Sequence, residues 1–406
     1  MGREQTKRRA LGAGAAAALL TFVGLSGQAD AATGPERPTS DPVFATRTST
    51  FAQRNVDAVR TPSGWFAVWA ENRGGGNDIF GGHVGAGGQL PDGGGITISP
   101  GVDNGLNPGL SAVNPAVAVD DDGQYLVTWT DDDLGGDTDV YAARVGAAGQ
   151  VLDPAALTID DDADIDGGPD VVWTGRAFVV VYQAPASTAA VRVSSAGQVT
   201  PLGTVATGVV NADVARSGST ELLVGQRGTN RITGLRLDDG GAPLGTVFEI
   251  TGTSVPGRQI QPTVAATPSG WLAAWTDERN GSTGVGDVYA ARVASDGTVL
   301  DPDGFPVPEA VGNQDGPRAG DGNPVLVTWR DDRDGEGDLF GAHVSSAGTV
   351  AEPGGTPIST TAGGESAQAV VPGAGTDAAA FYTRTAPEAP YGGANHGFFR
   401  TVSSPK

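Results

Sequence analysis

Three observations predict an all-β protein built from seven similar units. A tryptophan, a polar glycine-rich loop, an aspartate, an aromatic strand and a basic residue recur in this order about every 50 residues. Runs of β-branched and aromatic residues alternate with turns, which use most of the 64 glycines and 27 prolines among the 406 residues. No ten-residue window beyond the first thirty-odd residues has the periodicity of an amphipathic helix.

The fullest copy of the repeat reads Trp275-Thr276-Asp277-Glu278-Arg279, followed by Asp287-Val288-Tyr289 and Arg292-Val293. Similar copies begin at Trp69, Trp129 and Trp329, whereas the third, fourth and seventh units lack the tryptophan, loop and aspartate. The basic residue that ends the third strand counts the units, and it falls at His83, Arg144, Arg192, Arg236, Arg292, His343 and Arg400.

Each unit has room for four strands, which unit two places at 115–119, 125–129, 139–145 and 150–159. Seven units of four antiparallel strands predict a seven-bladed β-propeller, because a ring buries both faces of every small sheet against its neighbours. The alternative is an open β-solenoid, but this would need polar capping units that the sequence lacks.

The chain divides into three predicted segments. Residues 1–31 have a positive start, an apolar stretch and the cleavage motif Ala29-Asp30-Ala31, which together predict a signal peptide and therefore a secreted protein. Residues 32–41 are proline-rich and predict a flexible leader, and residues 42–406 predict a single propeller domain. The seventh unit ends after its third strand, so we expect an N-terminal strand within residues 42–50 to complete the last blade.

Composition narrows the possible partners. The net charge of −22 argues against nucleic acid and anionic membranes and favours solubility and cation binding. There is no cysteine, and no segment after the signal peptide approaches the ~20 apolar residues that span a bilayer. We therefore expect a monomer without disulfides or a transmembrane segment.

The pattern Trp-x-Asp-x-Arg-x-Gly, followed by Asp, Ile or Val, and Tyr or Phe, resembles a repeat of secreted bacterial β-propeller proteins. The resemblance covers most of residues 42–402 and is strongest in units one, two, five and six. It implies the fold and export. The group has no single activity, so no catalytic residue can be assigned from it.

The repeated acids give the first candidate site. In a propeller they lie on one face, and we expect each to accept main-chain N–H groups and to pair with the arginine of its loop. Unit two differs because Asp133 replaces the arginine, and this predicts a binding site for a cation. The predicted binding residues are Asp131, Asp133, Asp137 and Asp139.

The second candidate site is the acidic run that precedes unit three. Its spacing, with aspartates at 162, 164, 166 and 170 and Gly167 between them, resembles the calcium loops of integrin-type propeller repeats. It predicts calcium bound by Asp162, Asp164, Asp166 and Asp170. The alternative is a solvated acidic turn, since the glutamate that ends an EF-hand loop is absent.

No catalytic residue is predicted. His83 and His343 occupy the position that other units fill with arginine, there is no cysteine nucleophile, and no Gly-x-Ser-x-Gly motif occurs. We therefore expect a secreted, non-enzymatic propeller that binds a protein partner or a carbohydrate through its acidic loop face. The alternatives are a polysaccharide hydrolase with paired carboxylates on that face, and a structural cell-surface or matrix component.

Overall fold

The computed structural model describes the chain in fourteen segments. These are residues 31–39, 43–44, 47–48, 52–73, 76–99, 112–132, 138–161, 167–228, 231–281, 284–335, 337–361, 364–373, 377–388 and 393–405. Within them the secondary structure is entirely β, so no helix that could cross a membrane is found in this part of the chain.

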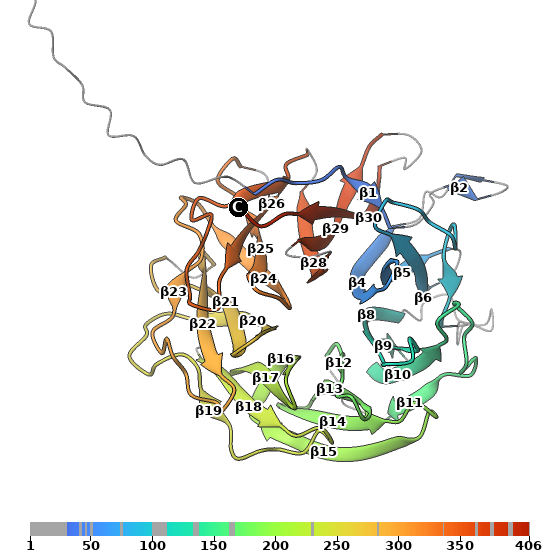
Figure 1. Ribbon diagram of the computed structural model, residues 1–406, viewed down its shortest axis with the longest axis horizontal. Coiled ribbons are helices and arrows are strands. Elements are labelled where there is room, and N and C mark those ends of the chain that lie inside the picture. The colour runs from blue at the N-terminus through green and yellow to red at the C-terminus, as the bar shows by residue number, and fades with distance from the viewer. Residues whose placement is uncertain are drawn as a thin grey trace, which may run out of the picture.

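Seven four-stranded antiparallel sheets form a ring, as Figure 1 shows, and this confirms the predicted seven-bladed β-propeller. The innermost strands are β4 (Gln53–Thr61), β8 (Ala112–Val119), β12 (Asp170–Trp173), β16 (Val209–Ser217), β20 (Gln259–Thr267), β24 (Gln314–Gly320) and β28 (Glu365–Pro372). The second strands are β5 (Gly64–Asn72), β9 (Tyr125–Asp132), β13 (Phe178–Ala184), β17 (Thr220–Arg227), β21 (Gly270–Asp277), β25 (Val325–Asp331) and β29 (Ala378–Ala386).

The third strands are about as long as the second strands, whereas the outermost strand has two to four residues in every blade except the third, where β15 has nine. The third strands are β6 (Asn77–Gly85), β10 (Thr138–Val145), β14 (Ser187–Val193), β18 (Arg231–Leu237), β22 (Asp287–Ala294), β26 (Asp338–Val344) and β30 (Ala394–Val402). The outermost strands are β7 (Ile96–Thr97), β11 (Leu157–Asp160), β15 (Val199–Thr207), β19 (Phe248–Glu249), β23 (Phe305–Pro306), β27 (Thr356–Ser359) and β1 (Arg37–Pro38).

The hydrophobic core is divided among the junctions between blades. Each of the seven clusters of buried apolar side chains combines residues of two neighbouring blades. Tryptophans contribute to these junctions: Trp271 Nε1 donates to the Ala215 carbonyl of the preceding blade at 3.0 Å, and Trp65 Nε1 donates to the Pro372 carbonyl at 3.0 Å. The second of these bonds joins the first blade to the last.

An N-terminal strand closes the ring, but it is not the predicted one. Arg37–Pro38 pairs with β30, opposite Phe399 and Phe398. The prediction that residues 42–50 complete the last blade is therefore wrong in position. Within that stretch, β2 (Val43–Phe44) and β3 (Arg47–Thr48) pair with each other. The segment predicted as a leader, 32–41, holds the closing strand.

A charged contact explains the choice of closing strand. Glu36 Oε2 accepts a hydrogen bond from Arg384 Nη2 at 2.6 Å, and Glu36 Oε1 accepts one from the Tyr382 hydroxyl at 2.6 Å. Burial opposes ionisation of Glu36, but these hydrogen bonds outweigh it and lower the pKa of the carboxyl. An apolar sequence pattern does not predict this strand, because the polar residue Glu36 makes the contact that holds the segment in place.

One buried side chain is acidic at a position that is apolar in the other blades. This position lies at the start of the second strand, and in six blades it is occupied by Trp65, Tyr125, Phe178, Trp271, Val325 and Ala378. In blade 4 it is Glu221, which is 0% exposed. Neither of its carboxylate oxygens has a hydrogen-bond partner in the described structure, and Arg216 Nε lies 3.9 Å away. Burial raises the pKa of Glu221 to about 8, so the side chain is mostly protonated at neutral pH.

We predict that the closing segment is essential for stability. A chain that begins at Asp41 loses β1 and the hydrogen bonds of Glu36 with Arg384 and Tyr382, although Arg384 keeps its ion pair with Glu388. Its melting temperature should fall by many degrees relative to a chain that begins at Ala31. Differential scanning calorimetry of the two chains makes the comparison, and superimposable melting curves would contradict the assigned closure.

We predict that Glu221 destabilises the fold above mildly acidic pH. Its pKa is about 8 when folded and near its usual 4.5 when unfolded, so the folded state retains a proton that the unfolded state releases between these values. Stability therefore falls as pH rises through this window. Glu221→Met should raise the melting temperature at pH 8, and the gain should shrink towards pH 4.5.

The exposed Glu249 of the same blade provides the control for this prediction. Glu249→Met should leave the pH dependence of the melting temperature unchanged, because the side chain lies on the surface. A Glu221→Met variant that is less stable than the natural protein at pH 8 would show that the buried carboxyl has a stabilising partner.

Candidate functional site

The repeated acids form a structural unit with their arginines, as predicted. In blade 5 the Asp277 carboxylate accepts two hydrogen bonds from Arg279, at 2.9 Å from Nε and 2.7 Å from Nη2. Asp277 also accepts the indole N–H of Trp275 at 2.8 Å. Arg279 Nη1 donates to the Asp303 carbonyl at 2.7 Å, and its guanidinium lies 3.9 Å from the Tyr289 ring centroid. One arginine therefore joins three strands of its blade.

Blades 1 and 6 contain the same unit. Each acid accepts the tryptophan N–H and an arginine hydrogen bond, and each guanidinium covers an aromatic ring; the residues are Trp69, Glu71, Arg73 and Phe80, and Trp329, Asp331, Arg333 and Phe340. Burial opposes ionisation of Asp331, but the hydrogen bonds from Arg333 and Trp329 lower the pKa of its carboxyl. These acids are structural, and the loops that carry them contact the connections between blades on one face.

Two hydrogen bonds show how these loops contact the connections between blades. The Gly286 amide donates to Asn313 Oδ1 at 2.7 Å, and the Glu365 amide donates to the Gly337 carbonyl at 2.8 Å. In both cases a loop after a second strand meets the segment that leads into the next blade. We call this the loop face.

Blade 7 rebuilds the unit with the charges exchanged. Arg384 occupies the position of Asp277, because Tyr382 pairs with Phe398 as Trp275 pairs with Tyr289. The acid is Glu36 from the closing segment, and the Arg384 guanidinium lies 4.3 Å from the Phe398 ring centroid. The sequence does not reveal this arrangement, because acid and arginine come from opposite ends of the chain.

The basic residues of the third strands also have structural partners. Arg144 and Arg292 bind Asp153 and Asp301, each nine residues later, through two side-chain hydrogen bonds of 2.8–2.9 Å. His83 Nδ1 lies 2.7 Å from Asp92, and His343 Nδ1 lies 3.0 Å from Glu352, at the same spacing. The two histidines therefore take the place of arginine, as their repeat position predicted.

The predicted binding site of blade 2 is only partly within the described residues. Asp131 and Asp139 face each other across β9 and β10 and are 8% and 7% exposed. The Tyr141 hydroxyl donates to Asp139 Oδ2 at 3.1 Å. Asp133 and Asp137 lie outside the described residues.

The predicted calcium loop is likewise largely outside the described residues, which exclude Asp162, Asp164 and Asp166. Asp170 is described, and its carboxylate accepts the amides of Val171 and Val214 at 2.8 Å each. It lines the central cavity of the ring. Among the described residues no group of three or more acidic or histidine side chains is arranged to hold a metal ion.

The central cavity was not predicted, and it results from a bend near the start of the inner strands. The register shifts after Arg54, Val113, Val210, Ile260 and Asp315. The backbone there has a positive φ at Asn55, Asn114, Asn211, Gln261 and Gly316, between 51° and 59°. Asparagine and glycine adopt this conformation most readily. Two positions later the strands bring Asp57, Ala116, Asp213, Thr263 and Arg318 to the cavity wall.

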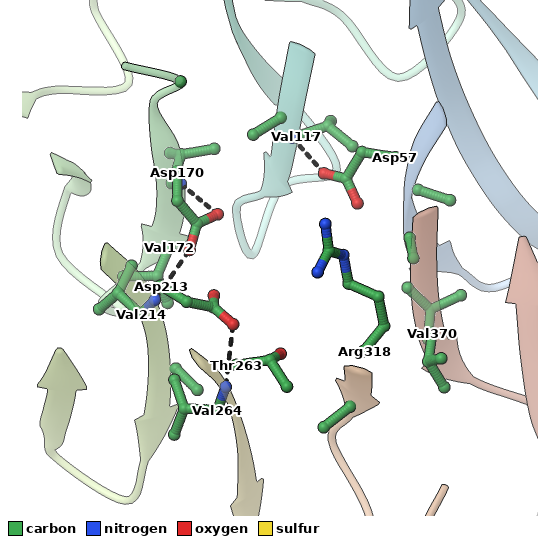
Figure 2. Close-up of a pocket in the computed structure, with 18 of the residues that line it drawn as sticks. Asp57, Val117, Asp170, Val172, Asp213, Val214, Thr263, Val264, Arg318 and Val370 are labelled. Atoms are coloured by element: carbon green, nitrogen blue, oxygen red, sulfur yellow. Dashed lines mark hydrogen bonds between the residues drawn. The ribbon is translucent and has the colours of Figure 1, made fainter. Parts of the chain in front are cut away.

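The cavity has a volume of about 1040 Å³ and is lined by all seven inner strands. Figure 2 shows Asp57, Asp170, Asp213, Thr263 and Arg318 directed into it from five different blades. The Arg318 guanidinium points towards Asp57, and the carboxylates of Asp170 and Asp213 point towards each other. Groups of both charges therefore converge on one space.

Three of the aspartates that line the cavity also connect neighbouring blades. Each carboxylate accepts a main-chain N–H of the next inner strand, from Val117 to Asp57, from Val214 to Asp170 and from Val264 to Asp213, at 2.8–2.9 Å. These bonds position the carboxylates and contribute to closing the ring.

The environment of the cavity favours protonated acids. Burial, the charge of Asp213 and a hydrogen bond with Asp213 raise the pKa of Asp170 well above its usual value. Burial raises the pKa of Asp57 to about 6, although the amide of Val117 and the charge of Arg318 oppose the shift. At neutral pH, Asp57 is therefore mostly ionised, whereas the environment of Asp170 shifts that carboxyl towards the protonated form.

A weak sequence signal for this cavity exists. The triplets Asn55-Val56-Asp57, Asn211-Ala212-Asp213 and Gly168-Pro169-Asp170 open the inner strands of blades 1, 4 and 3. Each places a residue that tolerates a bend two positions before an acid. The repeated tryptophan motif is the stronger sequence pattern, and it predicted a site on the loop face instead.

No family model and no curated protein matches this chain. Among solved structures, a protein of unknown function from Dyadobacter fermentans has 10% identity and a TM-score of 0.51, and the match covers 91% of this chain and 99% of that one. Trypanosoma rangeli sialidase has 10% identity and a TM-score of 0.48 over 91% of this chain and 59% of its own length. An endo-arabinase from Bacteroides thetaiotaomicron has 13% identity and a TM-score of 0.38 over 60% of this chain and 94% of its own. At these identities the comparisons assign no activity to this chain, and the propeller fold rests on its own sheet topology.

Proposed function

We propose that the protein is a secreted, non-enzymatic binding protein that holds a polyhydroxylated ligand, such as a glycan, in the central cavity. The observation that carries this proposal is the convergence of carboxylates, a guanidinium and a hydroxyl from five blades on a cavity of about 1040 Å³. A cavity of this size accommodates a ligand of drug or oligosaccharide size.

The chemistry of the wall suits hydroxyl groups. A sugar hydroxyl can donate to an ionised carboxylate such as Asp57 and accept from the Arg318 guanidinium. The amide side chains of Asn55, Asn114, Asn211 and Gln261 line the same cavity and offer both donors and acceptors. A ligand of a single charge would meet groups of its own sign on this wall.

Binding is favoured over hydrolysis by the positions of the acids. The two carboxyls of a glycosidase are separated by about 5–9.5 Å, whereas Asp170 and Asp213 are hydrogen-bonded to each other. Each also accepts a main-chain N–H group from the next blade. These contacts restrict the movement that an acid or a nucleophile needs.

A hydrolase is the second candidate, because two cavity acids have different environments. Asp170, whose pKa burial and the neighbouring Asp213 raise well above its usual value, could serve as the general acid, with Asp57, whose pKa is about 6, as the base or nucleophile. This mechanism would act on a glycan in the same cavity.

Export and calcium binding are proposals that rest on the sequence alone. The signal peptide at 1–31 supports secretion. The spacing of Asp162, Asp164 and Asp166 supports calcium, but Asp170 already accepts two main-chain N–H groups.

We predict that the cavity binds an oligosaccharide that a glycan array can identify. Asp57→Asn and Arg318→Met should each weaken binding of that oligosaccharide about 10–100-fold in isothermal titration calorimetry, because each removes a charged hydrogen bond. Asparagine can still accept the Val117 amide, so the first variant should keep the fold. Asp121→Asn, in an exposed turn, is the control that should bind normally.

A reducing-sugar assay on the bound oligosaccharide separates the two candidates. No release of sugar is expected. Release that disappears in Asp170→Asn while binding persists would establish the hydrolase, and unchanged affinity in both cavity variants would place the ligand elsewhere.

A further inference from the structure

Three blades bring a tryptophan, an aromatic ring and a guanidinium together on the loop face, and in blade 1 the three planar groups form a stack. In blade 1 the Trp69 and Phe80 rings are stacked, in blades 5 and 6 the tryptophan pairs with the aromatic residue across the two strands, and in all three a guanidinium lies 3.6–4.1 Å from the centroid of the aromatic ring. The same guanidinium binds the acid that follows the tryptophan. Each arginine thus occupies a site formed by a carboxylate, the face of an aromatic ring and a main-chain carbonyl group.

Blade 2 keeps the first two layers of this stack. The Trp129 and Tyr141 rings have centroids 6.3 Å apart at 29°, close to the 6.4 Å and 22° of Trp69 and Phe80. Asp131 follows Trp129 at the same spacing as the acids of the other three blades and is buried. The loop of residues 132–137 contains no arginine or lysine, so it cannot supply the third layer.

Two observations indicate that no group of the described residues supplies the third layer in blade 2. Phe80, Tyr289 and Phe340, which a guanidinium covers, are buried, whereas Tyr141 is only half-buried. Trp129 is 2% exposed, and its Nε1 has no hydrogen-bond partner in the described structure. In the three complete blades this N–H donates to the acid that the arginine holds in place.

Blade 2 differs from blades 1, 5 and 6 at a second position, where it has an alanine in place of glycine. A Cβ atom at Gly304 would lie 2.7 Å from Cζ2 of Trp275, and Gly95 and Gly355 have similar contacts with their tryptophans. In blade 2 this position is Ala156, whose φ is 57°. The neighbouring carbonyl, which in blade 5 accepts Arg279 Nη1, belongs in blade 2 to Ala155.

We propose that Asp131, Tyr141 and the Ala155 carbonyl form a binding site for a guanidinium group, which an arginine side chain of a partner protein supplies. The site would complete in trans the unit that three other blades complete with their own arginine. The net charge of −22 favours a basic partner. The site lies on the loop face and is independent of the proposed function of the central cavity.

The electrostatic surroundings support a cation at this position. Burial, together with the hydrogen bond and charge of Asp139 and the charge of Asp131, raises the pKa of Tyr141 to about 12. The buried acids Asp131 and Asp139, together with the face of the Tyr141 ring, are suited to bind one planar cation. A metal ion usually needs more ligands than this part of the described structure provides.

The first test uses N-acetyl-L-arginine amide as the probe, with N-acetyl-L-citrulline amide as the neutral isostere. We expect the arginine probe to bind with a dissociation constant of about 1 mM or below and the citrulline probe not to bind. Binding should shift the indole ¹H–¹⁵N resonance of Trp129, which Trp129→Phe identifies, because Asp131 then accepts this N–H. Free L-arginine should bind more weakly than an arginine-containing tripeptide; equal affinity would contradict a protein partner.

The second test restores the missing arginine. Asp133→Arg recreates the sequence of blades 5 and 6, so it should abolish binding of the arginine probe and raise the melting temperature by a few degrees. Asp133→Asn is the matched control and should still bind the probe. Asp131→Asn should lose binding, because the carboxylate is the main ligand.

A positive control in blade 6 shows whether an open site of this type binds a guanidinium compound. Arg333→Ala opens the equivalent site in blade 6, and ethylguanidinium should restore part of the lost stability. If ethylguanidinium rescues Arg333→Ala while the natural protein does not bind the arginine probe, the proposal is wrong. Undiminished probe binding by Asp133→Arg would also overturn it.

Discussion

The need to neutralise buried carboxylates governs this structure. In blades 1, 5 and 6 an arginine two residues after the acid neutralises the carboxylate, and this arginine also contacts the outer part of its blade. Blade 7 exchanges the charges and takes its acid, Glu36, from the start of the chain. The ring is closed by the same type of contact that stabilises the single blades.

Other buried acids use different solutions. Those of the cavity accept main-chain N–H groups from the next blade, burial raises the pKa of Asp170 well above its usual value, and Glu221 is mostly protonated at neutral pH. Because the same position can be compared across blades, each departure is informative. Glu221 stands where other blades have apolar residues, and Asp133 stands where they have arginine. We assign binding to the departure at Asp133, a pH-dependent loss of stability to Glu221, and stability to the repeated residues.

Sequence reasoning recovered the fold and the structural role of the repeat, because both follow from local patterns that occur several times. It missed the closing strand, since Arg37–Pro38 lacks apolar alternation and depends on Glu36 meeting Arg384 at the far end of the chain. It also missed the cavity. Asp57, Asp170, Asp213 and Arg318 are far apart in sequence, and only closure of the ring brings them together. Of the predicted acidic sites, Asp131 and Asp139 are brought together by the pairing of β9 and β10.

The central claim is that ligands enter the middle of the ring. A crystal structure of the protein with the oligosaccharide selected by a glycan array would test it most directly. Our account predicts sugar density in the central cavity, with hydroxyl groups in contact with Asp57 and Arg318. Density confined to the loop face or to the outer strands, with an empty cavity, would contradict it.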